Sequence, residues 1–70
     1  MSIVNWIVDK YHVGTDPKVI AADITARSER AGLGPEMTAL MVEKALKRHD
    51  ENVALYRLVT GSITTRGAKR

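Results

Sequence analysis

Residues 35–61 read PEMTALMVEKALKRHDENVALYRLVTG and carry the strongest pattern in the chain. The apolar-face positions are spaced by four, four, four, four, three and three residues, the periodicity that lines one side of an α-helix. They are Met37, Met41, Ala45, His49, Val53, Tyr56 and Val59. The pattern predicts a long helix against which the rest of the chain packs.

An unbroken helix over residues 35–60 would be about 39 Å long, whereas a compact domain of this size is roughly 28 Å across. Two arrangements resolve the mismatch. The helix bends or breaks at residues 49–52, its one polar run, with Asp50 capping a final helix that begins near Glu51. Alternatively, it stays straight and its projecting end pairs with another chain. The polar run slightly favours a break or bend.

A second helix is predicted from Pro17 to about Ala31 by signals at both ends. Asp16 offers its carboxylate to free N–H groups, and Pro17 suits the first helical position because it lacks a donor that would have no partner. Gly32 supplies the left-handed residue that commonly ends a helix. The inward face of this helix is expected to comprise Ile20, Ile24 and Ala31.

A short helix over residues 3–12 is expected at the N-terminus, capped by Ser2. Its apolar face would consist of Ile3, Trp6, Ile7 and Tyr11. A β-strand is the alternative, because the run from Ser2 to Val8 is rich in β-branched residues. The third helix opens at Gly34-Pro35-Glu36, with a permissive cap, a proline and an acidic first turn.

The predicted fold is therefore all-α: a small bundle of three helices, or four if the long helix breaks. The helical domain covers residues 1–61. Residues 62–70, SITTRGAKR, contain one large apolar residue and are expected to form a disordered basic tail.

Composition points to a cytoplasmic protein that does not enter a membrane. The chain has 70 residues and no cysteine, which excludes disulfides and thiolate metal sites. Its apolar runs are too short to cross a bilayer, and the N-terminus lacks the features of a secretory signal. The net charge is +3, with the surplus in the second half, where seven basic residues face four acidic ones. A surplus of this size is typical of an ordinary solvated surface.

Catalysis is not expected, nor is a metal, a cofactor or a small-molecule substrate. His12 and His49 lack other ligands at helical metal-site spacing, and the serines and threonines lack a nucleophile motif. Residues 32–34, GLG, are too short for a phosphate-binding loop. His49 continues the apolar ladder and is expected to be a partly buried, hydrogen-bonded side chain.

The favoured function is a non-enzymatic interaction module that binds a protein partner or a second copy of itself, as an adaptor, regulator or accessory subunit. The core is small, the ladder includes adaptable methionines, and one tryptophan could anchor a contact. The candidate contact residues are Trp6, Met37, Met41, Val53 and Tyr56.

A helix-turn-helix-like DNA-binding regulator is the alternative, because residues 17–48 form two helices joined by a short glycine-containing turn. Glu36 and Glu43 would then face phosphates, and the first turn lacks the usual base-reading side chains. The candidate nucleic-acid contacts are Lys44, Lys47, Arg48 and, in the tail, Arg66, Lys69 and Arg70.

Overall fold

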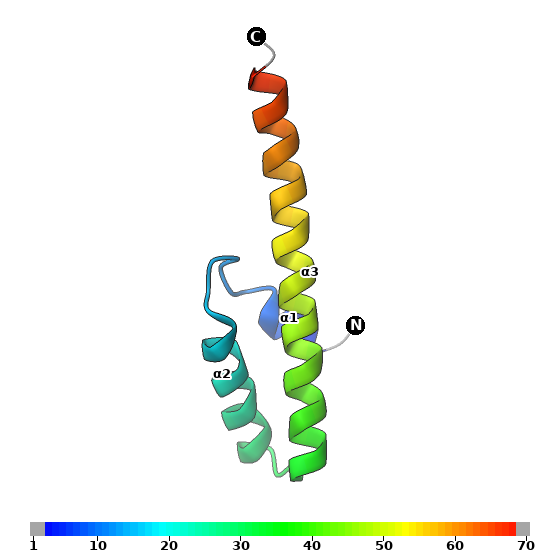
Figure 1. Ribbon diagram of the computed structural model, residues 1–70. Coiled ribbons are helices and arrows are strands. Elements are labelled where there is room, and N and C mark those ends of the chain that lie inside the picture. Colours follow the sequence, from blue (N-terminus) through cyan, green and yellow to red (C-terminus); the bar gives the residue numbers. More distant parts are fainter. Residues whose placement is uncertain (1–2, 69–70) are drawn as a thin grey trace.

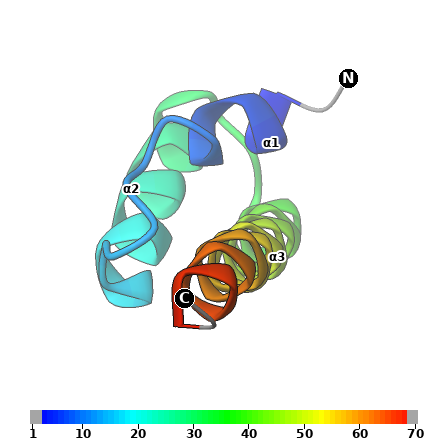
Figure 2. The same ribbon diagram turned by 90° about the horizontal axis from the view of Figure 1, so that it is seen from above.

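A computed structural model describes the backbone of residues 3–68 and the side chains of residues 3–60. Within this range the chain forms three α-helices and no strand: α1 (Ile3–Val8), α2 (Pro17–Arg30) and α3 (Pro35–Ala68). The all-α prediction is confirmed. Helices α2 and α3 lie side by side and run in opposite directions (Figure 1). Seen along α3, both α1 and α2 lie to one side of it (Figure 2).

The start of α2 follows the predicted capping chemistry. Asp16 has extended backbone angles, and its carboxylate accepts a hydrogen bond of 2.9 Å from the backbone N–H of Lys18. Pro17 occupies the first helical position, where its missing N–H costs nothing. These residues begin the helix where the sequence predicts.

The end of α2 is a Schellman motif around Gly32, whose φ is 78°. The N–H of Gly32 donates to the carbonyl of Glu29 at 3.1 Å, and the N–H of Leu33 donates to the carbonyl of Ser28 at 3.1 Å. These are the two bonds that define the motif, and glycine adopts the required left-handed conformation without strain. The predicted helix end is confirmed.

The core is small and joins all three helices. Its buried apolar side chains are Val4, Val8, Ile20, Ile24 and Ala45. The inward face predicted for α2 is confirmed at Ile20 and Ile24 but is wrong at Ala31, which is exposed. Ala31 is the C-cap, where the chain already turns towards α3, and Ser28 is buried in its place.

The first helix is shorter than predicted. Residues 3–8 are helical, so the strand alternative is wrong, but α1 ends at Val8 and not at residue 12. The N–H groups of Lys10 and Tyr11 donate to the carbonyls of Ile7 and Val8 at 3.2 and 3.0 Å. These bonds span three residues instead of four, so the chain tightens and leaves the helix.

Helix α3 passes through residues 49–52 without interruption, so the predicted break and the fourth helix are wrong. Two of the four polar side chains there have partners in other parts of the fold. His49 Nε2 lies 3.1 Å from the carbonyl oxygen of Thr15, and Asn52 Nδ2 donates to the Asp9 carboxylate at 2.9 Å. Because these groups are satisfied by neighbouring segments, the helix continues.

The continuous helix makes the molecule elongated. Its extents are 55 × 22 × 16 Å and its radius of gyration is 15.3 Å, above the value near 11 Å for a compact chain of this length. Helix α3 ends at Ala68, beyond Thr60, where the sequence predicts its end. The side chains of the expected basic tail, residues 62–70, lie outside the described residues, so the predicted disorder of that tail stays a prediction.

Candidate interaction surface

A polar clamp joins the turn after α1 to the middle of α3. Arg48 donates from Nε and Nη2 to the two carboxylate oxygens of Asp9, each at 2.8 Å, and Asn52 donates to the same carboxylate. The hydrogen bonds from Arg48, followed by that from Asn52, lower the pKa of Asp9 to about 2. The clamp therefore holds α1 on α3 and occupies the Arg48 guanidinium.

A second polar cluster ties the loop after α1 to α2. The Tyr11 hydroxyl donates to the Asp23 carboxylate, which also accepts from Arg27 Nε at 3.1 Å. Burial, and then the bond to Asp23, raise the pKa of Tyr11, while the hydrogen bond from Tyr11 lowers the pKa of Asp23. This cluster positions the loop against α2.

His49 fastens the same loop to α3 and is 4% exposed. Its Nε2 donates to the carbonyl oxygen of Thr15, 3.1 Å away. The expectation of a buried, hydrogen-bonded histidine is confirmed. Among the described residues, no group of three or more potential metal ligands gathers at either histidine or elsewhere.

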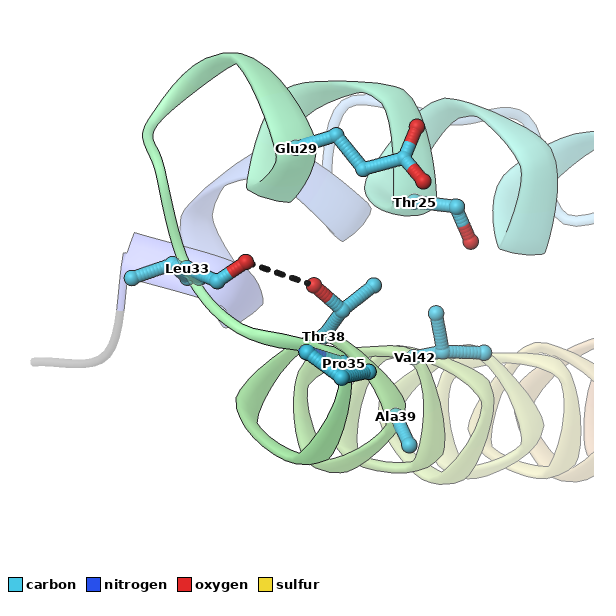
Figure 3. A pocket seen from close by; sticks show the side chains of 7 residues that line it. All are labelled: Thr25, Glu29, Leu33, Pro35, Thr38, Ala39 and Val42. Carbon is cyan, nitrogen blue, oxygen red and sulfur yellow. Dashed lines mark hydrogen bonds between the residues drawn. The ribbon is translucent and has the colours of Figure 1, made fainter.

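An open groove of about 470 Å³ runs between α2 and α3 near their connection (Figure 3). Thr25 and Glu29 border it from α2, Leu33 from the connection, and Thr38 and Val42 from α3. The Thr38 hydroxyl donates to the Leu33 carbonyl at 3.5 Å, a long bond that holds the turn. Sequence reasoning did not find this groove, whose lining comes from helices that meet only in the fold.

A smaller groove of about 170 Å³ lies between α1, α2 and α3, and its lining is almost wholly apolar. Ile3 and Ile7 contribute from α1, Ile24 from α2 and Met41 from α3. The predicted contact residue Met41 is half-buried here and packs against the core. Its place in the fold is explained by intramolecular packing.

The longest uncovered part of the fold is the upper half of α3 (Figure 1). We call residues 54–60 the projecting segment; every side chain in it is exposed. Four of these side chains are large and apolar: Leu55, Tyr56, Leu58 and Val59. Arg57 is the only charged residue in the segment. An apolar helix surface of this kind is unusual for a face that meets only water.

One side of the projecting segment continues the line along which α3 meets the rest of the fold. Ala45 and His49 are buried, and Val53 is half-buried. Tyr56 and Val59 follow at three-residue steps on the same side of the helix, but they are 54% and 51% exposed. We call Val53, Tyr56 and Val59 the open face. Neither α1 nor α2 extends alongside the upper half of α3 (Figure 1).

The other predicted contact residues lie elsewhere. Trp6 is half-exposed on α1, with the Lys10 ammonium 3.6 Å from its ring centroid. Met37 is exposed in the first turn of α3, about 28 Å of helix away from Tyr56. The five predicted contact residues therefore do not form one surface, and only Val53 and Tyr56 belong to the open face.

The predicted nucleic-acid contacts are also divided. Lys44 and Lys47 are exposed, whereas Arg48 is paired with Asp9. The side chains of Arg66, Lys69 and Arg70 lie outside the described residues. Helices α2 and α3 form an antiparallel hairpin (Figure 1), whereas the helices of a DNA-reading helix-turn-helix cross at about 90–120°. The DNA-binding alternative gains no support from this arrangement.

Leu55 and Leu58 are absent from the sequence-based candidates because they lie off the apolar ladder. The available signal was the near absence of charge around them, since Arg57 is the only charged residue between Asn52 and Thr65. No helix in the described part of the chain combines the length and apolarity that crossing a bilayer requires.

Comparison with known proteins gives no relative: no family model, no curated protein and no solved structure matches the chain. The function is therefore inferred from the exposed and engaged side chains described above. Of these, the uncovered apolar side of α3 is the feature that the fold itself does not use.

Proposed function

We propose that this chain is a small helical interaction module that binds a protein partner through the projecting segment of α3. The observation that carries the proposal is the open face, in which Tyr56 and Val59 extend a buried line past the last helix that could cover it. A partner helix laid on this face would complete the packing that α1 and α2 begin.

The chemistry of the face suits protein recognition. Tyrosine is enriched among the residues that dominate interface energies, because its ring buries a large area while its hydroxyl remains able to hydrogen bond. Val53 and Val59 flank it with apolar side chains of restricted rotamer freedom. Such a face gains most from a partner that excludes water from all three side chains.

The rest of the fold holds this segment in position. The Asp9–Arg48 clamp and the His49–Thr15 hydrogen bond fix α1 and the long loop against α3 just before the projecting segment begins. These contacts occupy Arg48 and His49, which precede Val53 on α3. The first half of α3 is held by contacts within the chain, whereas the projecting segment is exposed. This difference supports a binding role for α3.

Site-specific photo-crosslinking in cells tests the proposal. A photoreactive amino acid at Tyr56 should yield crosslinks to a protein that mass spectrometry can identify, either another protein or the chain itself. The matched control is the same amino acid at Glu36, which is also exposed but lies at the opposite end of α3. Absence of crosslinks at Tyr56 above the level at Glu36 would overturn the proposal.

A further inference from the structure

We propose that the groove between α2 and α3 is a second binding surface, and that its occupant is a positively charged amphipathic helix of a partner protein. This surface is separate from the projecting segment, so the proposal goes beyond the function proposed above and does not depend on it. We call it the hairpin groove. The residues that line it are Thr25, Glu29, Leu33, Pro35, Thr38, Ala39 and Val42.

The shape of the hairpin groove suits a helix. The groove is open and has a volume of about 470 Å³, within the range of roughly 300–1,000 Å³ that is typical of ligand sites. Thr25 of α2 and Val42 of α3 point towards each other across it (Figure 3). Because these side chains are small and Ala39 is smaller still, a third helix can approach the two backbones and pack between them.

Helix α1 leaves this side of the α2–α3 pair uncovered. Ile3 and Ile7 of α1 border the smaller groove, whereas the residues that line the hairpin groove belong to α2, α3 and their connection. Within it, Leu33 is 37% exposed and Ala39 is also exposed. A partner helix would remove this apolar surface from water without displacing α1.

Acidic side chains flank the hairpin groove on both edges. Glu29 borders it from α2 (Figure 3). Glu36 and Glu43 are three residues before and four residues after Ala39, so they neighbour that groove residue on the surface of α3. All three glutamates are exposed. An occupant of the groove therefore meets carboxylates along both of its sides.

Cations of the chain do not neutralise these carboxylates. The ion pairs among the described side chains do not include them, and none of the described residues that line the groove is lysine or arginine. Lys44 and Lys47 border a different hollow, together with Asn5 of α1. The chain as a whole carries a net charge of +3, so the acidic edges are a local feature. They favour a partner of positive charge.

The spacing of the acids indicates the charge pattern of the partner. Glu36 and Glu43 are seven residues apart, which is about 10.5 Å along α3. Residues seven apart lie on the same side of a helix. Lysine or arginine at seven-residue spacing on the partner helix would therefore oppose both glutamates, while apolar residues between them enter the groove.

An NMR titration with a synthetic peptide tests the proposal. The probe is a helical peptide of leucine, alanine and lysine, in which lysines at seven-residue spacing flank both edges of an apolar stripe. It should shift the backbone amide signals around the hairpin groove in a saturable way at millimolar concentration or below. The control peptide has the same composition but lysines distributed around the helix, and it should bind at least about 10-fold more weakly. Equal binding of the two peptides, shifts confined to residues 54–60, or no saturable shift would each overturn the proposal.

A charge reversal tests the edge of the groove. Glu43→Lys should weaken binding of the probe peptide at least about 10-fold, because like charges would then face each other. Glu51→Lys is the matched control, since Glu51 is also exposed on α3 but borders the hollow beside Lys44 and Lys47. It changes the net charge by the same amount and should alter the dissociation constant by less than about threefold. Equal losses would show a general attraction between charges and overturn the assignment to this groove.

A change of shape without a change of charge completes the test. Ala39→Phe should weaken binding several-fold, because the ring would fill part of the groove. The matched control is Leu40→Phe, at the next position of α3, which is exposed but does not line the groove. Unchanged binding by Ala39→Phe would contradict the proposed site. Crosslinks at Tyr56 report on the projecting segment alone, so either proposal can fail while the other stands.

Discussion

Arg48 and Asp9 form a two-point ion pair, with Nε and Nη2 each 2.8 Å from a carboxylate oxygen, across 39 residues of sequence. The pair connects the end of α1 to α3 nearly two turns before the projecting segment. Both side chains are partly exposed, so solvent and salt weaken their attraction. The geometry nevertheless fixes the position of α1, because a guanidinium and a carboxylate that meet at two points have little freedom to rotate.

The ion pair predicts a specific dependence of stability on pH. The pKa of Asp9 falls from 3.8 to about 2 in the folded chain, so the folded state binds fewer protons at this site than the unfolded state does. Its contribution to stability is fully present above about pH 4 and is lost as the pH falls to about 2. We expect Asp9→Asn to lower the melting temperature at neutral pH and to match the unmodified chain at pH 2.

The control for this prediction is Glu29→Gln, which removes a negative charge from an exposed position on α2. It should leave the melting temperature nearly unchanged across the same pH range. If the melting temperatures of Asp9→Asn and the unmodified chain differ as much at pH 2 as at neutral pH, the carboxylate does not titrate in the clamp.

The hydrogen bond from His49 to Thr15 predicts a larger loss of stability. His49→Ala removes a buried ring and leaves the Thr15 carbonyl without its partner, so the free energy of unfolding should fall by about 2 kcal/mol or more. His12→Ala is the matched control, because the His12 ring is exposed and accepts only a local bond from the Gly14 N–H. Its effect should stay below about 1 kcal/mol. Chemical denaturation measures both, and equal effects would contradict the role assigned to His49.

These two contacts also explain which parts of the fold the sequence could predict. The caps of α2 depend on neighbours within a few residues, so Asp16 and Gly32 could be recognised directly. The polar run at residues 49–52 could not be interpreted in the same way. His49 and Asn52 are satisfied by Thr15 and Asp9, which are 34 and 43 residues away in the sequence. Without those partners, four polar residues in a row indicate an interruption.

The same limit applied to the candidate surface. Sequence periodicity found Val53 and Tyr56 because they continue the apolar ladder. It also selected Met41, which the fold half-buries, because periodicity shows which side of a helix is apolar and not how far the neighbouring helices extend along it. The point near Val53 beyond which α3 is no longer covered depends on how far α1 and α2 extend along it.

Gly32 provides a prediction about the turn between α2 and α3. Its φ of 78° is one that side chains rarely adopt, although a Cβ there would meet no atom within 4 Å. Gly32→Val should therefore destabilise through backbone strain alone, by about 1–2 kcal/mol. Gly34→Ala is the matched control, because Gly34 has equal space and lacks a positive φ. If thermal or chemical unfolding gives the same stability for both variants, the left-handed turn is not the cause.

The last prediction concerns DNA. The interaction proposal predicts no measurable binding of a fluorescent duplex at physiological salt. The Arg48 guanidinium is already occupied by Asp9, so of the candidate nucleic-acid contacts with described side chains, Lys44 and Lys47 remain as a small exposed pair. Each lysine that neutralises a phosphate would add about 0.9 to the slope of log affinity against log salt. Fluorescence anisotropy at two salt concentrations measures this slope. Tight binding whose slope falls by about two units in the double variant Lys44→Ala, Lys47→Ala would instead favour the DNA-binding alternative. The matched control is Lys18→Ala, which removes an exposed lysine in the first turn of α2 and should leave the slope unchanged if binding is confined to α3.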